Sequence, residues 1–196
     1  MSSSHISRQL IHTRKMHTQV FRREDGLWDI EVSLLDTKGK DFHLASSVRV
    51  KGEPIHQMLL AITIDTQFNV LAARAESLAV PYPGSCELIT PEYEKLVGLN
   101  LVSGFRAAVK NLFKGIKGCS HITELCSVLP TAAIQAFAGE VLQSKVDGDA
   151  HPDQMPFQLN GCHALRTDGE VVKKYYKIWY GAPLVAPEMR KPGSSD

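Results

Sequence analysis

The pattern of apolar and polar residues divides the chain into a strand-rich first part and a helix-rich second part. The clearest alternation runs through residues 27–35, where Trp28, Ile30, Val32 and Leu34 are separated by polar residues. A period of two places these apolar side chains on one face of a β-strand. Residues 10–21, 41–51, 56–64 and 68–78 predict further strands, and residues 36–40 predict a turn. We therefore expect an antiparallel β-meander with one packed face.

The later part of the chain has the spacing of amphipathic helices. Thr90, Pro91 and Glu92 predict a helix start, because threonine can cap, proline fits the first helical position and an acid suits the positive end of the dipole. We expect helices over residues 93–97, 102–113 and 120–143, the last one kinked at Pro130. Residues 147–156 predict a loop. The predicted fold class is α+β, an antiparallel β-meander followed by a helical layer.

Length and composition are those of one folded domain. The chain has 196 residues, of which 43% are hydrophobic and 22% charged, and its formal net charge is +1. We place a single domain over residues 8–180, with flexible tails at residues 1–7 and 187–196. So small a net charge gives no field that would attract nucleic acid or an anionic membrane, so we expect neither as a partner. Short basic clusters such as Arg14-Lys15 are interpreted as solvated surface.

The cysteines are expected to be reduced. No apolar run approaches the ~18–20 residues of a membrane helix, and the first residues lack the pattern of a secretory signal, so we predict a cytoplasmic protein. The chain has four cysteines and no CxxC pair; they are Cys86, Cys119, Cys126 and Cys162. They are candidates for core thiols, metal ligands or reactive groups.

The segment from Gly118 to Leu125 carries three reactive side chains at a predicted helix start. Unpaired N–H groups and the helix dipole would favour a thiolate at Cys119, for nucleophilic attack or metal ligation. His121 and Glu124 are three residues apart and share one helix face, where the carboxylate could orient the imidazole. The alternatives are a small buried thiol at Cys119, and an acid that only stabilises the dipole beside a satisfied histidine.

A second pairing of carboxylate and imidazole occurs at Glu53 and His56, at the entry to a predicted strand. If the sheet and the helix pack together, both pairs could face one pocket. An approach of Glu53 and His56 to His121 would favour acid–base chemistry, whereas an approach of Cys86 to Cys119 would favour metal binding.

Further polar candidates stand apart from these pairs. Asp29 lies on the polar face of the clearest strand, and His163 follows Cys162 late in the chain. The sequence contains no GxGxxG, Walker, GxSxG or HExxH motif. Nucleotide hydrolysis, Rossmann cofactors and serine hydrolysis are therefore not predicted, and the cofactor is unknown.

Six linked motifs extend from His12 to Leu165, and the likeness they carry continues to Trp179. They are His12-Thr13-Arg14, Arg22 to Glu31, Asp36-Thr37-Lys38, Gly52 to His56, Gly118 to His121 with Glu124-Leu125, and Cys162 to Leu165. Together they resemble the bacterial domain-of-unknown-function family 2889. That family looks like a companion of aromatic-acid catabolic functions, so the resemblance implies a small aromatic or phenolic acid as substrate.

The order of elements is also similar, more remotely, to iron–sulphur cluster scaffold (SufE/NifU-like) domains and cysteine-desulphurase partners. These have a meander, a loop cysteine matched here by Cys86, and a cysteine that opens the last long helix, matched by Cys119. The likeness implies a scaffold-like α/β sandwich. The scaffold's first cysteine has no counterpart here, so Asp29, His43 or His56 would have to replace it.

Three function classes remain. The first is an enzyme of small aromatic or phenolic acid catabolism that uses lyase or decarboxylase-type acid–base chemistry in a cleft between sheet and helices. Its catalytic residues would be Glu53, His56, His121 and Glu124, and its substrate-binding residues Asp29, Cys119 and His163. The second is a metal or iron–sulphur binding carrier with the ligands Cys86, Cys119 and Cys162. The third is a non-catalytic small-molecule binding module. A small-molecule substrate is the expected partner, and a homo-oligomer stays open.

Overall fold

The computed structural model describes residues 6–142 and 155–184. Contacts between residues divide the chain into two compact units, Met1–Ala133 and Ile134–Asp196. The single domain over residues 8–180 stays a prediction. The predicted tail 187–196 lies outside the described residues, as do residues 1–5 of the other tail and residues 147–154 of the predicted loop.

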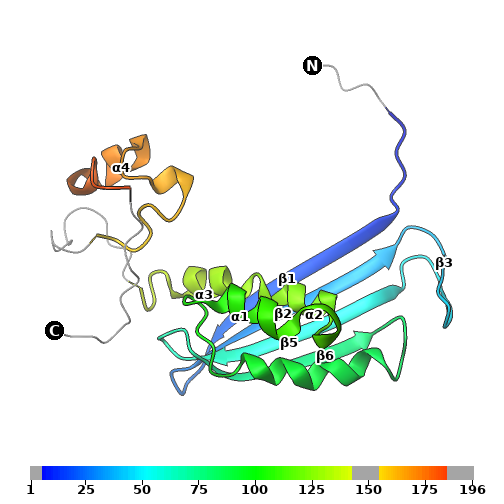
Figure 1. Cartoon of the computed structure of the whole chain (residues 1–196). Coiled ribbons are helices and arrows are strands. Elements are labelled where there is room, and N and C mark those ends of the chain that lie inside the picture. Colours follow the sequence, from blue (N-terminus) through cyan, green and yellow to red (C-terminus); the bar gives the residue numbers. More distant parts are fainter. Residues whose placement is uncertain (1–5, 143–154, 185–196) are drawn as a thin grey trace. The chain divides into compact units, whose positions relative to one another are not determined.

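The first unit contains a four-stranded antiparallel sheet in the order β1-β2-β5-β6 (Figure 1). Its strands are β1 (His12–Arg22), β2 (Trp28–Lys38), β5 (Pro54–Ile64) and β6 (Val70–Ala79). The predicted antiparallel meander and the α+β class are thereby confirmed. The single strand expected over residues 41–51 is wrong: β3 (Phe42–His43) and β4 (Val48–Arg49) form a separate hairpin. The carboxylate of Asp41 accepts a hydrogen bond from the backbone N–H of Lys51 at 2.8 Å, so residues 41–51 form a closed loop.

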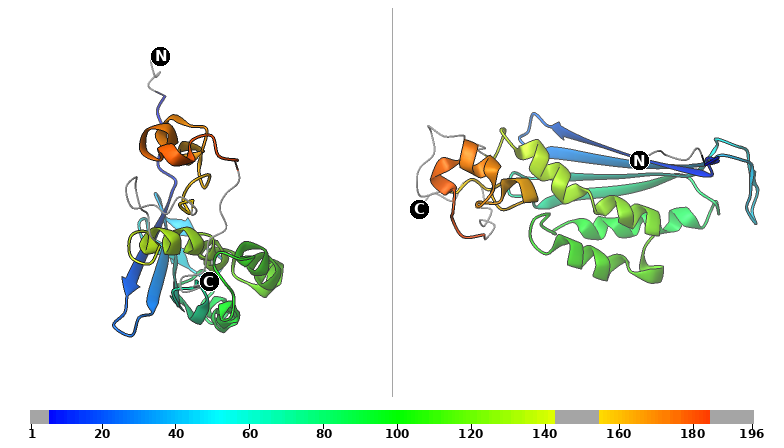
Figure 2. Two further views of the ribbon diagram at one scale, coloured as in Figure 1. Left: turned by 90° about the vertical axis from the view of Figure 1, so that its left-hand side faces the viewer. Right: turned by 90° about the horizontal axis from the view of Figure 1, so that it is seen from above.

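Helices follow the sheet, and α1 and α2 lie against one of its faces (Figures 1 and 2). The elements are η1 (Cys86–Leu96), α1 (Phe105–Phe113), η2 (Gly115–Lys117), α2 (Ser120–Cys126) and α3 (Leu129–Phe137). The single helix expected over residues 120–143 is wrong, because the chain breaks between α2 and α3. Pro130 explains the break, since proline has no N–H to donate to the carbonyl of Cys126, where α2 ends.

The core lies between this face of the sheet and the helices. Trp28, Ile30, Val32 and Leu34 of β2 are at most 6% exposed, which confirms the predicted alternation. The apolar stripe of α2 is buried as well, and α2 contacts both β2 and β5. This packing holds the first turn of α2 to the sheet.

Within residues 155–184, the second unit contains the short helices η3 (His163–Leu165), α4 (Glu170–Tyr175) and η4 (Lys177–Trp179). A buried threonine ties its loops together: the Thr167 hydroxyl donates to the backbone oxygen of Ala182 at 2.7 Å. None of the helices in residues 6–142 and 155–184 is long and apolar enough to span a bilayer.

Candidate functional site

A buried carboxylate, Asp36, is the centre of a polar cluster in the first unit. The two-residue period of β2 continues past Leu34, so Asp36 points to the core face and is only 2% exposed. An unpaired charge at such a position would be costly. Arg14 on β1 compensates it, because its Nε and Nη2 donate to Oδ1 and Oδ2 of Asp36, each at 2.8 Å. This fork is the strongest common geometry for a carboxylate.

The strand register brings three polar side chains into one row across the sheet. Asp36 pairs with Arg14 on β1 and with His56 on β5. A bulge between Asp36 and Thr37 leaves Ile55 without a partner, and bulges commonly redirect side chains near functional sites. Nδ1 of His56 lies 3.2 Å from Oδ2 of Asp36. His12, two residues before Arg14, places Nε2 3.3 Å from Oδ1.

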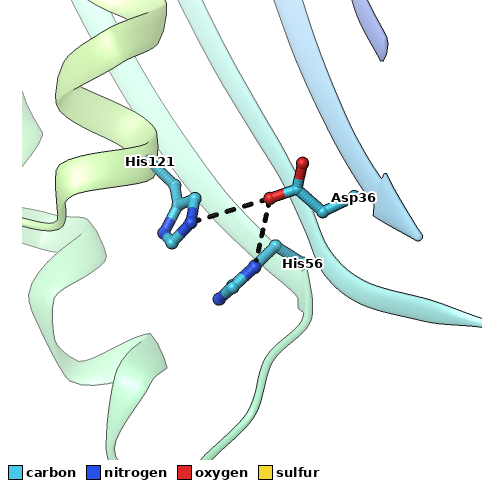
Figure 3. A group of neighbouring side chains, drawn as sticks. All are labelled: Asp36, His56 and His121. Carbon is cyan, nitrogen blue, oxygen red and sulfur yellow. Dashed lines mark ion pairs between the residues drawn. The ribbon is translucent and has the colours of Figure 1, made fainter. Parts of the chain in front are cut away.

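Helix α2 contributes a second imidazole from above the row. Nε2 of His121 lies 3.6 Å from Oδ2 of Asp36, and its ring stacks on that of His56 with 3.7 Å between centroids and 27° between planes (Figure 3). Glu124, one turn later, pairs with Nη1 of Arg14. Sheet and helix thus share one charge network, in which Arg14 bridges two carboxylates.

Tyr93 fixes the start of α2. Its hydroxyl accepts the backbone N–H of Cys119 at 2.9 Å, lies 2.8 Å from the backbone oxygen of Cys119, and contacts the Thr123 hydroxyl at 2.7 Å. Gly118 is required just before, because a Cβ there would stand 2.6 Å from atoms of Phe113. The backbone that carries His121 is therefore closely constrained.

Asp36 is held ionised. Burial raises the pKa of Asp36, but the hydrogen bonds and charge of Arg14, with smaller contributions from His12 and His121, outweigh burial and lower that pKa below its usual value. The carboxylate therefore offers only acceptor positions at neutral pH.

Both stacked imidazoles are held neutral. Burial lowers the pKa of His56, and a charge on His121 would lower it further. Burial also lowers the pKa of His121, with Arg14 acting in the same direction. Asp36 opposes both shifts without cancelling them. Two neutral rings beside one anion, each able to take a proton as the pH falls, form a proton-transfer arrangement.

The positions of the ring nitrogens assign the tautomers. Because ionised Asp36 can only accept, Nδ1 of His56 carries the proton that faces it, which leaves the lone pair on Nε2. Nε2 of His121 lies 3.6 Å from the same carboxylate, beyond hydrogen-bond length, so the negative charge of Asp36 favours a proton on this nitrogen without a hydrogen bond that fixes it. The other ring nitrogen, Nδ1, lies 3.9 Å from Sγ of Cys119.

The same three residues also meet the spacing of a metal site. Among the described residues, Asp36, His56 and His121 are the only His, Cys, Asp or Glu side chains found as a group of three, with donor atoms all within 4.8 Å of one another. The nitrogens that face Asp36, Nδ1 of His56 and Nε2 of His121, could serve either as N–H donors to the carboxylate or, without that proton, as ligands of an ion. The two uses exclude each other, because a ring nitrogen that carries a proton has no lone pair for a metal.

Four of the residues predicted from the sequence come together here. His56, His121 and Glu124 belong to the charge network, and Cys119 adjoins it through His121. His56 approaches His121, as the acid–base hypothesis required, but Glu53, the other residue of that hypothesis, does not. Their catalytic roles stay predictions.

Two other candidates lie elsewhere in the first unit. Glu53 is exposed, and its carboxylate accepts the backbone N–H of Val50 at 3.0 Å, so it stabilises a turn. Asp29 lies on the opposite face of β2, bound to Thr63 and Arg23. It is seven residues from Asp36, or about 23 Å along a strand at ~3.3 Å per residue. Neither belongs to the Asp36 network.

The cysteines proposed as metal ligands lie in different elements of the chain. Cys86 begins η1 and is half-buried, whereas Cys162 is exposed before η3 in the second unit. Across residues 6–142 and 155–184, no cysteine belongs to a set of three close metal-binding side chains. His163 is exposed in η3 of the second unit. A ligand set of Cys86, Cys119 and Cys162 stays a prediction.

Sequence reasoning missed Asp36, Arg14 and His12. The turn predicted at Asp36 is wrong, because β2 continues to Lys38. Arg14 is exposed, as predicted for a solvated surface, but its guanidinium also pairs with Asp36. One pattern pointed to Asp36: the period that buries Trp28 to Leu34 places residue 36 on the same face. No local pattern pairs Arg14 with Asp36, since they are 22 residues apart.

The comparison with protein families gives one match, to the model described as protein of unknown function (DUF2889), over residues 12–135. This is more than half of the chain. The chain belongs to the DUF2889 family. The matched region begins with β1 and includes the whole Asp36 network, whereas Cys162 and His163 lie beyond it. Among curated proteins and among solved structures, none matches the chain.

Proposed function

We propose that this DUF2889 protein is an enzyme that transfers protons through His56 and His121. One observation carries the proposal: two neutral imidazoles stack on each other and share a single oxygen of a buried, ionised carboxylate. An imidazole in such a position is a good base, because the carboxylate stabilises the imidazolium that forms when it takes a proton.

The two rings cannot both carry a charge easily. Their centroids are 3.7 Å apart, so protonation of one ring disfavours protonation of the other. A neutral ring can therefore take a proton from the substrate as a base, and the imidazolium so formed can return that proton as an acid while the other ring stays neutral. Asp36 keeps both rings oriented, and Arg14 keeps Asp36 ionised.

The proposed reaction class is a lyase or decarboxylase acting on a small organic acid. When such an acid loses carbon dioxide, the carbon left behind must receive a proton, and an imidazolium beside it can supply that proton. The imidazoles of His56 and His121 are 18% and 22% exposed, which leaves an edge of each ring open to a small molecule. The preference for aromatic or phenolic acids rests on the resemblance in sequence alone.

The test is turnover of a panel of small aromatic and phenolic acids by the purified chain and by His56→Gln and His121→Gln. We expect each substitution to slow turnover about 10²–10⁴-fold, the usual contribution of a general acid or base. His17→Gln is the matched control, because His17 is an exposed histidine of β1 that points away from Asp36. Full activity in both site variants would end the assignment.

The same assay distinguishes proton transfer through the two imidazoles from a metal-dependent reaction. Proton transfer through the rings predicts that turnover survives dialysis against a strong chelator and does not rise when Zn²⁺ or Fe²⁺ is added. Turnover that disappears on chelation and returns with one of these ions would assign Asp36, His56 and His121 to a metal instead.

A further inference from the structure

A thiol stands on the far side of His121 from Asp36. Sγ of Cys119 lies 3.9 Å from Nδ1 of His121, and Nε2 of the same ring lies 3.6 Å from Oδ2 of Asp36. We propose that Cys119 is a nucleophile that takes up an acyl group from small esters or thioesters, with His121 as its base and Asp36 as the group that positions His121. This reaction goes beyond the proton transfer proposed above.

The two nitrogens of His121 have different duties in this arrangement. The charge of Asp36, 3.6 Å from Nε2, favours a proton on that nitrogen, and in this tautomer Nδ1 has the lone pair that can accept the thiol proton of Cys119. A nucleophile, a base within reach and a third group that orients the base make up the general pattern of a covalent catalytic triad. Here the thiol of Cys119 and the imidazole of His121 come from the start of α2, and the carboxylate of Asp36 comes from β2. The buried carboxylate orients the imidazole, and the imidazole faces the thiol.

The backbone holds Cys119 in one place. Residue 119 has an extended backbone, and its N–H and C=O are both engaged by the Tyr93 hydroxyl. Gly118 packs against Phe113 too closely for any side chain. The backbone that carries the thiol therefore keeps its position relative to the start of α2 without help from a ligand, as the backbone of preorganised catalytic groups does.

The environment of Cys119 differs from those of Cys126 and Cys162. Cys126 is buried on the same helix, with Sγ 3.7 Å from the backbone oxygen of Ile122, and burial raises the pKa of its thiol to about 12. It is an inert core thiol. Cys119 is half-buried, hence reachable. Cys162 is more exposed than either, which makes it the internal reference for simple accessibility.

Acylation requires only Cys119, His121 and the ester or thioester. Sγ of Cys119 attacks the acyl carbon while its proton passes to Nδ1 of His121. The bond from the acyl carbon to the leaving oxygen or sulphur breaks, and the leaving alcohol or thiol takes the proton back from His121. A thioester on Cys119 and one free alcohol or thiol result. Water, activated by the same ring, then releases the carboxylic acid and restores the thiol.

The experiment uses para-nitrophenyl acetate as an acyl probe on the full chain. Release of nitrophenolate reports the rate, and mass spectrometry of peptides from the quenched protein locates the acetyl group. We expect an initial burst of about one equivalent and acetylation of Cys119 ahead of Cys162, although Cys162 is the more exposed thiol. Acetylation of Cys162 at the same rate or faster would overturn the proposal, and this comparison needs no variant.

Substitutions then separate the roles. His121→Gln should slow acetylation of Cys119 about 100-fold, in the range of a lost general base, and leave acetylation of Cys162 unchanged. Cys162→Ser should leave the burst intact, and Cys119→Ser should abolish it. An unchanged rate at Cys119 in a folded His121→Gln protein would refute the role of the imidazole.

The two proposals fail separately. His56 has no place in the path from Cys119 to His121, so a folded His56→Gln protein should retain most of the burst while losing turnover of organic acids. In the wild-type chain, absence of the burst alone would refute the acyl chemistry, and absence of organic-acid turnover alone would refute the proton-transfer enzyme.

Discussion

Replacing Asp36 with asparagine tests the centre of the network. The substitution keeps the shape of the side chain but removes the charge to which Arg14, His12 and His56 all point. One amide oxygen can still accept, whereas the amide NH₂ group must face donors of Arg14 or His56. Removing one partner of a buried ion pair costs about 3–5 kcal/mol. Because the Arg14 side chain is 32% exposed and keeps Glu124, we expect a loss of about 2–4 kcal/mol in the free energy of unfolding.

Urea denaturation at pH 7 measures this loss in the unit that contains the network. Trp28 on β2 reports on the first unit, and a Trp179→Phe background removes the tryptophan of the second unit. The midpoint should fall with little change in the slope, because the surface exposed on unfolding stays similar. The low pKa of Asp36 stabilises the fold above about pH 3.8, and this contribution disappears as the pH falls through the depressed pKa. The difference in the free energy of unfolding between the wild type and Asp36→Asn should therefore shrink in strong acid.

Asp25→Asn is the matched control. Asp25 makes the same two-bond fork with Arg23, with Arg23 Nε at 3.0 Å and Nη2 at 2.6 Å, but both side chains are exposed. We expect no measurable change in the midpoint, since exposed pairs contribute little. An Asp36→Asn protein as stable as the wild type would contradict the argument, because it would mean that Arg14 does not depend on Asp36 for its partner.

Three further outcomes follow from the same contacts. The pKa values of His56 and His121 are lowered in the folded chain, so the unfolded chain binds more protons below about pH 6.5. The free energy of unfolding should therefore fall as the pH drops from 6.5 toward the folded pKa values. Urea titrations across pH 5–7 should show a smaller fall for the His56→Gln/His121→Gln double variant. Tyr93→Phe leaves the N–H of Cys119 unsatisfied and should cost about 1–3 kcal/mol in thermal or urea unfolding, whereas an unchanged stability would mean that this hydroxyl does not anchor α2. Gly118→Ala places a methyl group 2.6 Å from atoms at the end of α1 and should cost as much as an overpacked core, about 1–3 kcal/mol, with a matching loss of near-ultraviolet circular dichroism.

Local periodicity decided much of the fold. The alternation along β2 determined which face is buried, because consecutive side chains of a strand must point to opposite sides. The glycine, cysteine and histidine at residues 118–121 predicted the helix start that the structure has at Ser120. Periodicity did not reveal the break before Pro130, since the apolar stripe continues across it.

The candidate site was predictable only in part. The sequence singled out His56, His121, Glu124 and Cys119 because their chemistry and spacing are visible locally. It could not pair Arg14 with Asp36, because cross-strand register depends on how the whole buried face packs, and a slip of one residue would turn every side chain to the other face.

The sequence by itself determined an antiparallel sheet with helices after it, and a helix start with a thiol, an imidazole and an acid. Only the tertiary structure decided what these groups meet. Strand register and the bulge beside Thr37 place Asp36 between Arg14 and His56, and the packing of α2 on β2 and β5 brings His121 onto the same oxygen. The physical reason is that a buried charge needs partners, and those partners come from segments that only folding brings together.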